Sequence, residues 1–154
     1  MPPADDRDET RDEQLDRNWD ELLQELRITQ TGLQLLSGFL LTLPFTQVFA
    51  GLDSAQQWLY LVLVLVASLA VGLNLTPVML HRRVFGDHVK ERVVEVGHLV
   101  SQAVIVAIAL LVTGVATLIF SVVVTWTVGL VVGAALVVVF VALLLVVPRR
   151  LEPR

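Results

Sequence analysis

From Gly97 to Val147 the sequence contains no Asp, Glu, Lys or Arg. A helix crosses a hydrocarbon core of about 30 Å in about 20 residues, because each residue adds about 1.5 Å. The uncharged run is therefore long enough for two crossings. We expect helices over about 97–118 and 126–147, with a turn near Phe120–Thr125. Its unbroken length argues against buried strands, which are about four to eight residues long.

Two further apolar runs precede this one, at about 28–50 and 59–80. The composition indicates the same class, since 55% of the residues are hydrophobic and only 17% are charged, whereas soluble domains carry about 25% charged residues. Backbone groups in hydrocarbon must be paired within their own segment, which favours helices. We predict an all-α integral membrane bundle of four transmembrane helices, preceded by a short amphipathic helix, with the lipid bilayer as its first partner.

The segments outside the spans differ in character. Residues 1–17 are acidic and lack apolar periodicity, which predicts a flexible tail. Residues 18–27 predict an amphipathic helix that lies at the cytoplasmic membrane surface or runs into the first span. Residues 148–154 form a basic tail. Aromatic residues near the ends of the second and fourth spans are expected at the membrane interface: Trp58, Tyr60 and Trp126.

The distribution of basic residues predicts the orientation. All 11 Lys and Arg lie in residues 1–27, in the loop 81–95 or in the tail, and the loops 51–58 and 119–125 have none. With four spans, the three basic segments fall on one side of the membrane. The positive-inside rule then places both termini in the cytoplasm of a multi-pass protein of the inner (plasma) membrane.

Composition and motifs exclude several function classes. The chain has no cysteine, so disulfides and thiolate metal sites are absent. The net charge of −4 argues against a nucleic-acid partner. No Ser/His/Asp arrangement or Gly-rich phosphate loop is present, and we expect neither an enzyme nor a cofactor. Glu95 and His98 match the Glu-x-x-His step of di-metal bundles, but the second step that such a site requires is missing.

Polar side chains are costly in hydrocarbon and mark candidate functional positions. In the first span, polar residues from Arg27 to Ser37 recur at spacings of three and four, which places them on one helical face. A similar row begins the third span, and Asn74 lies near the end of the second. If the bundle interior gathers these faces, one cluster contains Arg27, Gln30, Gln34, Asn74, Glu95, His98 and Gln102.

This cluster has two interpretations. In the first, Glu95 and His98 exchange protons and the carboxamides coordinate a dehydrated cation, which gives a monovalent-cation/proton transporter. In the second, the cluster is the hydrated end of the bundle together with hydrogen bonds between helices. The protein is then a non-catalytic scaffold or accessory subunit that binds a membrane-protein partner through its cytoplasmic face.

Glycine and proline mark four further positions in the spans. Gly129 and Gly133 form a small-xxx-small step that allows close helix–helix packing, including packing in a homo-oligomer. Pro44 lacks a backbone donor and its ring clashes with the carbonyl four residues before it, so we expect the Leu40 carbonyl to be freed from the helical pattern. Pro77 has the same relation to Leu73, and it is a candidate end of the second helix.

Several segments resemble an uncharacterised family of small four-span inner-membrane proteins of high-GC Gram-positive bacteria. The resemblance is carried by Trp19–Arg27, Ile28–Gln34, Leu41–Phe45, His81–Arg83 and Lys90–His98, and it covers about residues 18–147. It implies the same four-span topology. Some members are automatically labelled sodium:proton antiporter, so the resemblance also implies antiport. The family has no defined catalytic or binding residues to carry over.

Overall fold

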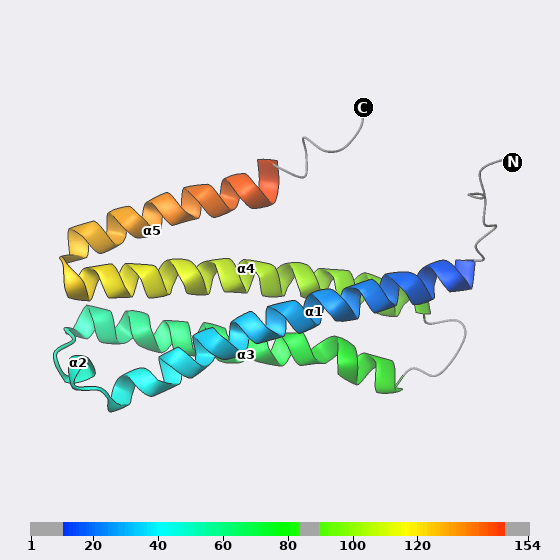
Figure 1. Cartoon of the computed structure of the whole chain (residues 1–154), viewed down its shortest axis with the longest axis horizontal. Coiled ribbons are helices and arrows are strands. Elements are labelled where there is room, and N and C mark those ends of the chain that lie inside the picture. The colour runs from blue at the N-terminus through cyan, green and yellow to red at the C-terminus, as the bar shows by residue number, and fades with distance from the viewer. Residues whose placement is uncertain (1–10, 84–89, 147–154) are drawn as a thin grey trace, which may run out of the picture.

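A computed structural model describes residues 11–83 and 90–146, and every regular element within these ranges is helical (Figure 1). This confirms the predicted all-α class. The elements are α1 (Arg11–Thr42), the 3₁₀ turn η1 (Leu43–Phe45), α2 (Gln47–Ala50), α3 (Ser54–Arg83), α4 (Lys90–Val123), α5 (Trp126–Val141) and the π-helical turn η2 (Ala142–Val146).

Three of these helices are long and apolar enough to cross a membrane. The apolar segments are Ser54–Thr76 on α3, Val96–Val123 on α4 and Trp126–Leu145 on α5 with η2. The turn between the last two falls where the sequence predicts it. The first predicted span, 28–50, is distributed over α1, η1 and α2 and is not among the three segments.

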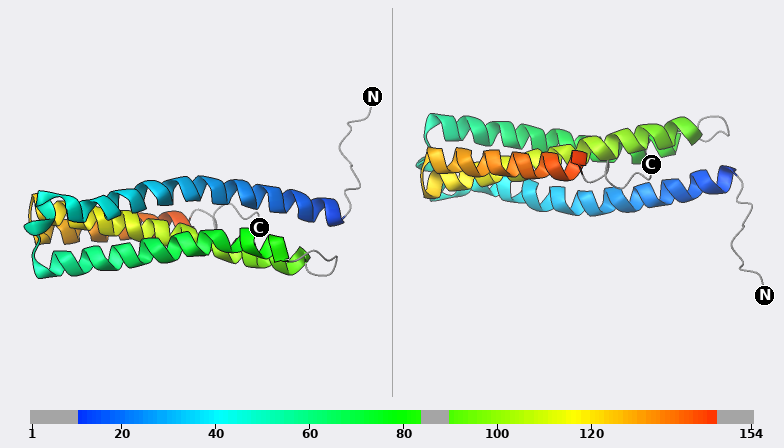
Figure 2. Two further views of the ribbon diagram at one scale, coloured as in Figure 1. Left: turned by 90° about the horizontal axis from the view of Figure 1, so that it is seen from below. Right: turned by 90° about the horizontal axis from the view of Figure 1, so that it is seen from above.

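The core lies where α1, α3 and α4 meet, and α5 packs against α4 on the outside of this trio. Figure 2 shows α1 and α3 on either side of α4, with α5 alongside α4. Each helix of the trio contributes one apolar stripe at spacings of three and four. The most deeply buried members of these stripes are Leu33, Leu40, Leu63, Ala67, Ala70, Val104, Leu111 and Leu118.

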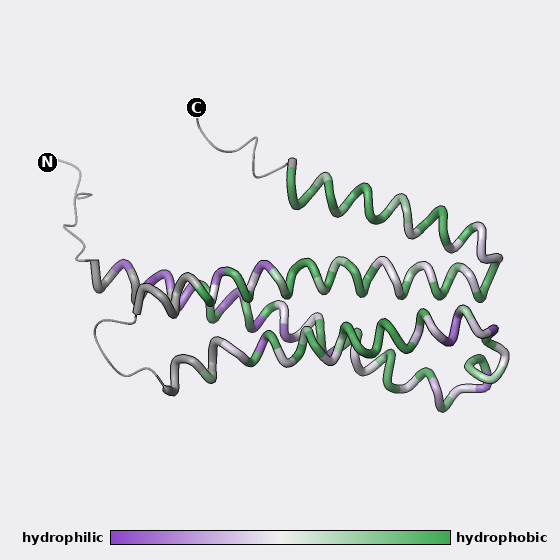
Figure 3. Tube along the Cα trace, turned by 180° about the vertical axis from the view of Figure 1, so that it is seen from behind, coloured by the Kyte–Doolittle hydropathy of each residue, from purple (hydrophilic) through white to green (hydrophobic). Residues whose placement is uncertain are grey.

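The outside of the bundle is apolar as well. Large exposed hydrophobic side chains follow α3 and α5, among them Leu61, Leu65, Leu69, Leu130, Val131 and Val138. Figure 3 shows hydrophobic residues along almost all of α5, and hydrophilic residues concentrated near the end of the bundle where α1 begins. An apolar exterior of this extent is typical of a surface that contacts lipid.

The helices alternate in direction, so the connections fall at two opposite ends. The start of α1, the end of α3 and the start of α4 share one end, at the right of Figure 1. The short helix α2 and the α4–α5 turn share the other end. Arg82, Arg83 and Lys90 close α3 and open α4, so these basic residues lie at the same end as the start of α1.

The first helix differs from the sequence-based expectation at both ends. It begins at Arg11 rather than near Asn18, so residues 11–17 are helical and continuous with the segment that follows. It ends at Thr42, before Pro44, because proline has no N–H to continue the hydrogen-bond pattern. The expected flexible tail before Arg11 and the basic tail 148–154 lie outside the described residues.

The Leu40 carbonyl, which Pro44 leaves without a backbone donor, accepts a hydrogen bond from another helix. The Tyr60 hydroxyl donates to the Leu40 carbonyl at 3.1 Å. Tyr60 is only 5% exposed, and the Phe49 ring contacts it edge-on at a centroid distance of 5.0 Å. Tyr60 is therefore part of the core and not an interface anchor. By contrast, α3 continues through Pro77 to Arg83.

Candidate functional site

Two polar contacts between helices lie on the α1 half that precedes Leu33. Asn74 on α3 is 4% exposed; its Oδ1 accepts from the Thr29 hydroxyl at 3.2 Å, and its Nδ2 donates to the Leu26 carbonyl at 3.4 Å. Ser101 on α4 is 3% exposed and donates to Glu25 Oε2 at 3.3 Å. We refer to Glu25, Thr29, Asn74 and Ser101 as the polar seam.

The polar seam is held by the apolar stripe of α1. Thr29 lies three residues after Leu26 and four before Leu33, both of which are buried, so its hydroxyl faces inward with them. Next to the seam, a Cβ atom added at Gly97 would lie 2.6 Å from Leu22 Cδ2, so the backbone of α4 closely approaches α1. Hydrogen bonds between helices at such a close approach, here involving the buried Asn74 and Ser101 side chains, fix the register of neighbouring helices.

The residues predicted to form an ion or proton path do not converge in the described structure. Only Asn74 is buried. The Glu95 side chain lies outside the described residues. The remaining members are exposed: Arg27, Gln30, Gln34, His98 and Gln102. Within residues 11–83 and 90–146, no three His, Asp or Glu residues come together in a group that could hold a metal ion.

Three members of the polar seam were missed by sequence reasoning. Glu25 lies in the predicted amphipathic helix 18–27, and the hydroxyls of Thr29 and Ser101 each precede a glutamine that sequence reasoning favours instead. A usable signal was present for Thr29, because it continues the leucine spacing of α1 whereas Gln30 and Gln34 do not. For Ser101 the sequence offers no such signal, since α4 is apolar on most of its circumference.

A second polar network joins the turns at the opposite end of the bundle. Asp53 and Gln56 form a reciprocal cap at the start of α3: the Gln56 N–H donates to Asp53 Oδ1 at 2.8 Å, and the Asp53 N–H donates to Gln56 Oε1 at 3.0 Å. The Trp126 indole donates to Asp53 Oδ2 at 2.8 Å, and Gln56 Nε2 donates to the Ser121 hydroxyl at 3.3 Å. The network connects α3 to the α4–α5 turn.

The Asp53 carboxylate remains ionised at neutral pH. The backbone N–H of Gln56 and then the Trp126 indole lower the pKa of Asp53 below its ordinary value of 3.8. The Gln56 N–H and the Trp126 indole therefore donate to a charged carboxylate, which accepts stronger hydrogen bonds than a neutral carboxyl group does. The network serves to position the turns, and it does not change its charge in the physiological range.

The small-xxx-small step of α5 packs within the chain. A Cβ atom at Gly129 would lie 2.6 Å from the Thr117 carbonyl oxygen and 2.9 Å from the Ser121 nitrogen. A Cβ atom at Gly133 would meet the Thr117 hydroxyl. These two glycines are the buried residues of α5. The face that we considered for a homo-oligomer is thus already covered by α4.

The chain matches the model of a known protein family. Residues 8–148 match the model of a family of unknown function (DUF6328), so the match includes α1, the polar seam and the network at Asp53. No curated protein and no solved structure matches the chain. The match agrees with the resemblance to an uncharacterised family, and it gives no support for a Gram-positive origin or for antiport.

Proposed function

The chain belongs to this family of unknown function, and we propose that it is a non-catalytic, four-span accessory protein of the cell membrane. In this proposal it binds a partner protein through the acidic part of α1. The proposal is carried by the continuity of α1, which joins the acidic segment to the bundle without a break from Arg11 to Thr42. Leu22 and Leu26 are 1% and 4% exposed, so this segment is packed onto the bundle.

The proposal counts α1 as a membrane span in addition to the three apolar segments on α3, α4 and α5. The Leu26 carbonyl contacts Asn74, and the Leu40 carbonyl contacts Tyr60. Asn74 and Tyr60 lie near opposite ends of the apolar segment Ser54–Thr76. The part of α1 between these contacts therefore runs alongside a helix that can cross the membrane, and we assign it the same depth.

The proposed orientation places both termini in the cytoplasm. The start of α1 lies at the same end of the bundle as Arg82, Arg83 and Lys90 (Figure 1). The opposite end contains Asp53 and Trp126. The two stretches of chain that pass through it, residues 43–81 and 93–148, contain no Lys or Arg. The positive-inside rule favours the cytoplasm for the basic end.

The charge of the acidic part of α1 favours binding to a protein over binding to lipid headgroups. Asp20, Glu21 and Gln24 are exposed. Glu25 is exposed as well, and its carboxylate accepts a hydrogen bond from Ser101. Anionic headgroups of the cytoplasmic leaflet repel carboxylates. A basic surface on a neighbouring protein is attracted to them, and such charge complementarity accelerates association and selects the partner.

Charge reversal tests the accessory function. Cross-linking and purification from the source membranes should recover a discrete partner with the wild-type chain, and the Asp20→Lys/Glu21→Lys variant should lose it. Thr127→Lys, which adds a positive charge at an exposed position at the opposite end, is the control and should retain the partner. Retention of the partner by the charge-reversed variant, or recovery of no partner by the wild type, would refute the proposal.

The alternative of cation/proton transport makes an opposite prediction. Transport through the predicted cluster requires Glu95, His98 and the carboxamides to meet in the interior, and the described side chains of this set do not meet there. We expect vesicles containing the purified chain to show no proton movement driven by a sodium or potassium gradient. Proton flux that depends on such a gradient and is lost in Glu95→Gln would replace the accessory function with antiport.

A further inference from the structure

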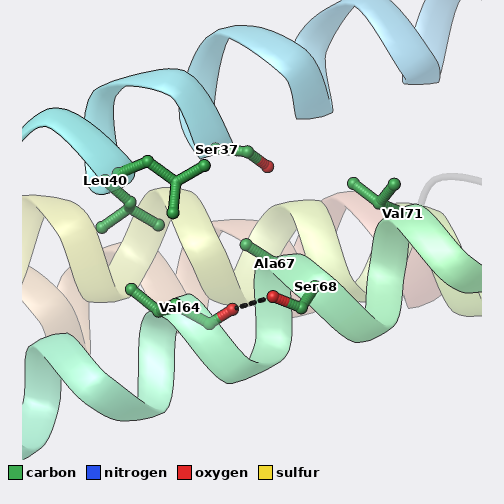
Figure 4. A pocket seen from close by; sticks show the side chains of 7 residues that line it. Ser37, Leu40, Val64, Ala67, Ser68 and Val71 are labelled. Atoms are coloured by element: carbon green, nitrogen blue, oxygen red, sulfur yellow. Dashed lines mark hydrogen bonds between the residues drawn. The ribbon is translucent and has the colours of Figure 1, made fainter.

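An apolar groove runs between α1 and α3 (Figure 4). Its volume is about 400 Å³. Its walls are formed by Ser37, Leu40 and Leu41 of α1 and by Val64, Ala67, Ser68 and Val71 of α3. The α3 residues belong to the apolar segment Ser54–Thr76, so the groove lies at the depth of the hydrocarbon core. This placement does not depend on what the acidic part of α1 binds.

A row of polar side chains on α1 leads to this groove: Gln30 and Gln34 precede Ser37, which lines it together with Leu41. Gln30, Gln34, Ser37 and Leu41 are separated by four, three and four positions, which places them on one side of the helix. Gln30 and Gln34 are exposed, and neither carboxamide makes a hydrogen bond to the described part of the chain. The Ser37 hydroxyl is buried in the groove wall, also without a partner among the described residues.

This row differs from the lipid-facing surface of α5, where residues Leu130 to Val141 include no polar side chain. Within the apolar segment of α3, exposed positions are occupied mostly by leucine and valine, for example Leu65 and Leu69. Carboxamides and hydroxyls without partners are costly in hydrocarbon, because acyl chains neither donate nor accept hydrogen bonds. The occupant of the groove must therefore provide polar groups as well as apolar contact.

We propose that the occupant is a second copy of this chain, which forms a two-fold dimer in the membrane through α1 and α3. The membrane gives every copy the same orientation, so a two-fold axis along its normal brings identical residues to the same depth. Carboxamides and hydroxyls both donate and accept. The row of Gln30, Gln34 and Ser37 can thus pair with the same row of the second copy. The buried Ser37 hydroxyl becomes accessible to it when the side chain turns about its Cα–Cβ bond.

The shape and charge of the groove fit this occupant. Ala67 lies in its wall, and a Cβ atom added at Gly38 on α1 would meet nothing within 4 Å, so a second helix can approach closely. No charged residue lines the groove, so the partner needs no opposite charge. Gly129 and Gly133, the other small residues considered for self-association, are covered by α4.

Cross-linking locates the interface directly, since the chain has no cysteine. We expect Ser68→Cys and Ser37→Cys, oxidised in membrane vesicles, to give a covalent dimer. Leu130→Cys on α5, at a position that is 59% exposed, is the matched control and should remain monomeric. Cross-linking at Leu130→Cys without cross-linking at the groove would overturn the proposal.

Measurement of the oligomeric mass completes the test. In lipid nanodiscs or mild detergent, the wild type should have twice the 17.0 kDa mass of one chain. Gln34→Leu should weaken dimerisation by roughly threefold to tenfold through the lost hydrogen bonds. Gln102→Leu removes an exposed carboxamide of α4 outside the groove and should have no effect. A monomeric wild type, with or without bound lipid, or equal effects of the two variants, would overturn the proposal.

Discussion

At the scale of single residues, the clearest relation is between a proline and a distant tyrosine. Pro44 removes the donor that the Leu40 carbonyl would otherwise use, and Tyr60 supplies a replacement at 3.1 Å. The sequence predicts the freed carbonyl, because it follows from proline chemistry alone. It does not predict the donor, because the pairing of Tyr60 with Leu40 depends on how α1 and α3 pack.

This relation predicts a coupling between two substitutions. Tyr60→Phe should lower the free energy of unfolding by about 1 kcal/mol, since a buried carbonyl loses its partner. In a Pro44→Ala background the same substitution should cost less, because residue 44 then has an N–H that can reach Leu40. Equilibrium unfolding of the four proteins measures the coupling. An equal cost in both backgrounds would show that Tyr60 does not replace the missing donor.

The network around Asp53 predicts how stability depends on pH. The pKa of Asp53 is lowered from 3.8 in the folded chain, chiefly by the Gln56 N–H. Its contribution to stability is therefore complete above that value and is lost as the pH falls through the lower, folded-state pKa. Thermal unfolding should show wild type more stable than Asp53→Asn by a constant margin at pH of about 5 to 8, and by a shrinking margin below 3.8. A margin that grows on acidification would contradict this assignment.

At the scale of elements, α1 shows what a polar pattern can and cannot predict. The spacing of Arg27, Gln30 and Gln34 correctly places them on one face, but it does not say that this face points inward. The leucine stripe at Leu26, Leu33 and Leu40 decides the buried side, since burial of the larger apolar surface gains more free energy. The pattern predicts an interior position for the polar face because polar groups are costly in lipid. The same reason applies to a face that is covered by another chain.

The contact between α4 and α5 predicts unequal effects of two glycine substitutions. Gly129→Ala should destabilise the protein by about 1–3 kcal/mol, because the added methyl group meets backbone atoms of Thr117 and Ser121 that cannot rotate away. Gly72→Ala on α3 has open space around the added Cβ and is the matched control, with unchanged or slightly higher stability. Unfolding in mixed micelles compares the two, and equal stability of both variants would exclude the close approach.

At the scale of the whole molecule, the sequence predicts where the helices lie along the chain better than which helices pack against one another. Hydrocarbon thickness divides the long uncharged run into α4 and α5 with the turn at the right place. It does not predict that α5 contacts α4 while α1 and α3 complete the core, because α5 is apolar on every side and its pattern favours no single face. That choice depends on Gly129 and Gly133, whose lack of side chains permits the contact.

The central claim is that α1 crosses the membrane, so that the acidic segment and the Asp53 network lie on opposite sides. Cysteine labelling with a membrane-impermeant maleimide tests it most directly, using Gln14→Cys near the start of α1 and Ser54→Cys at the start of α3, both exposed positions in a chain without cysteine. In intact cells only Ser54→Cys should react, and in inside-out vesicles only Gln14→Cys. Reaction of both positions from the same side would contradict the account.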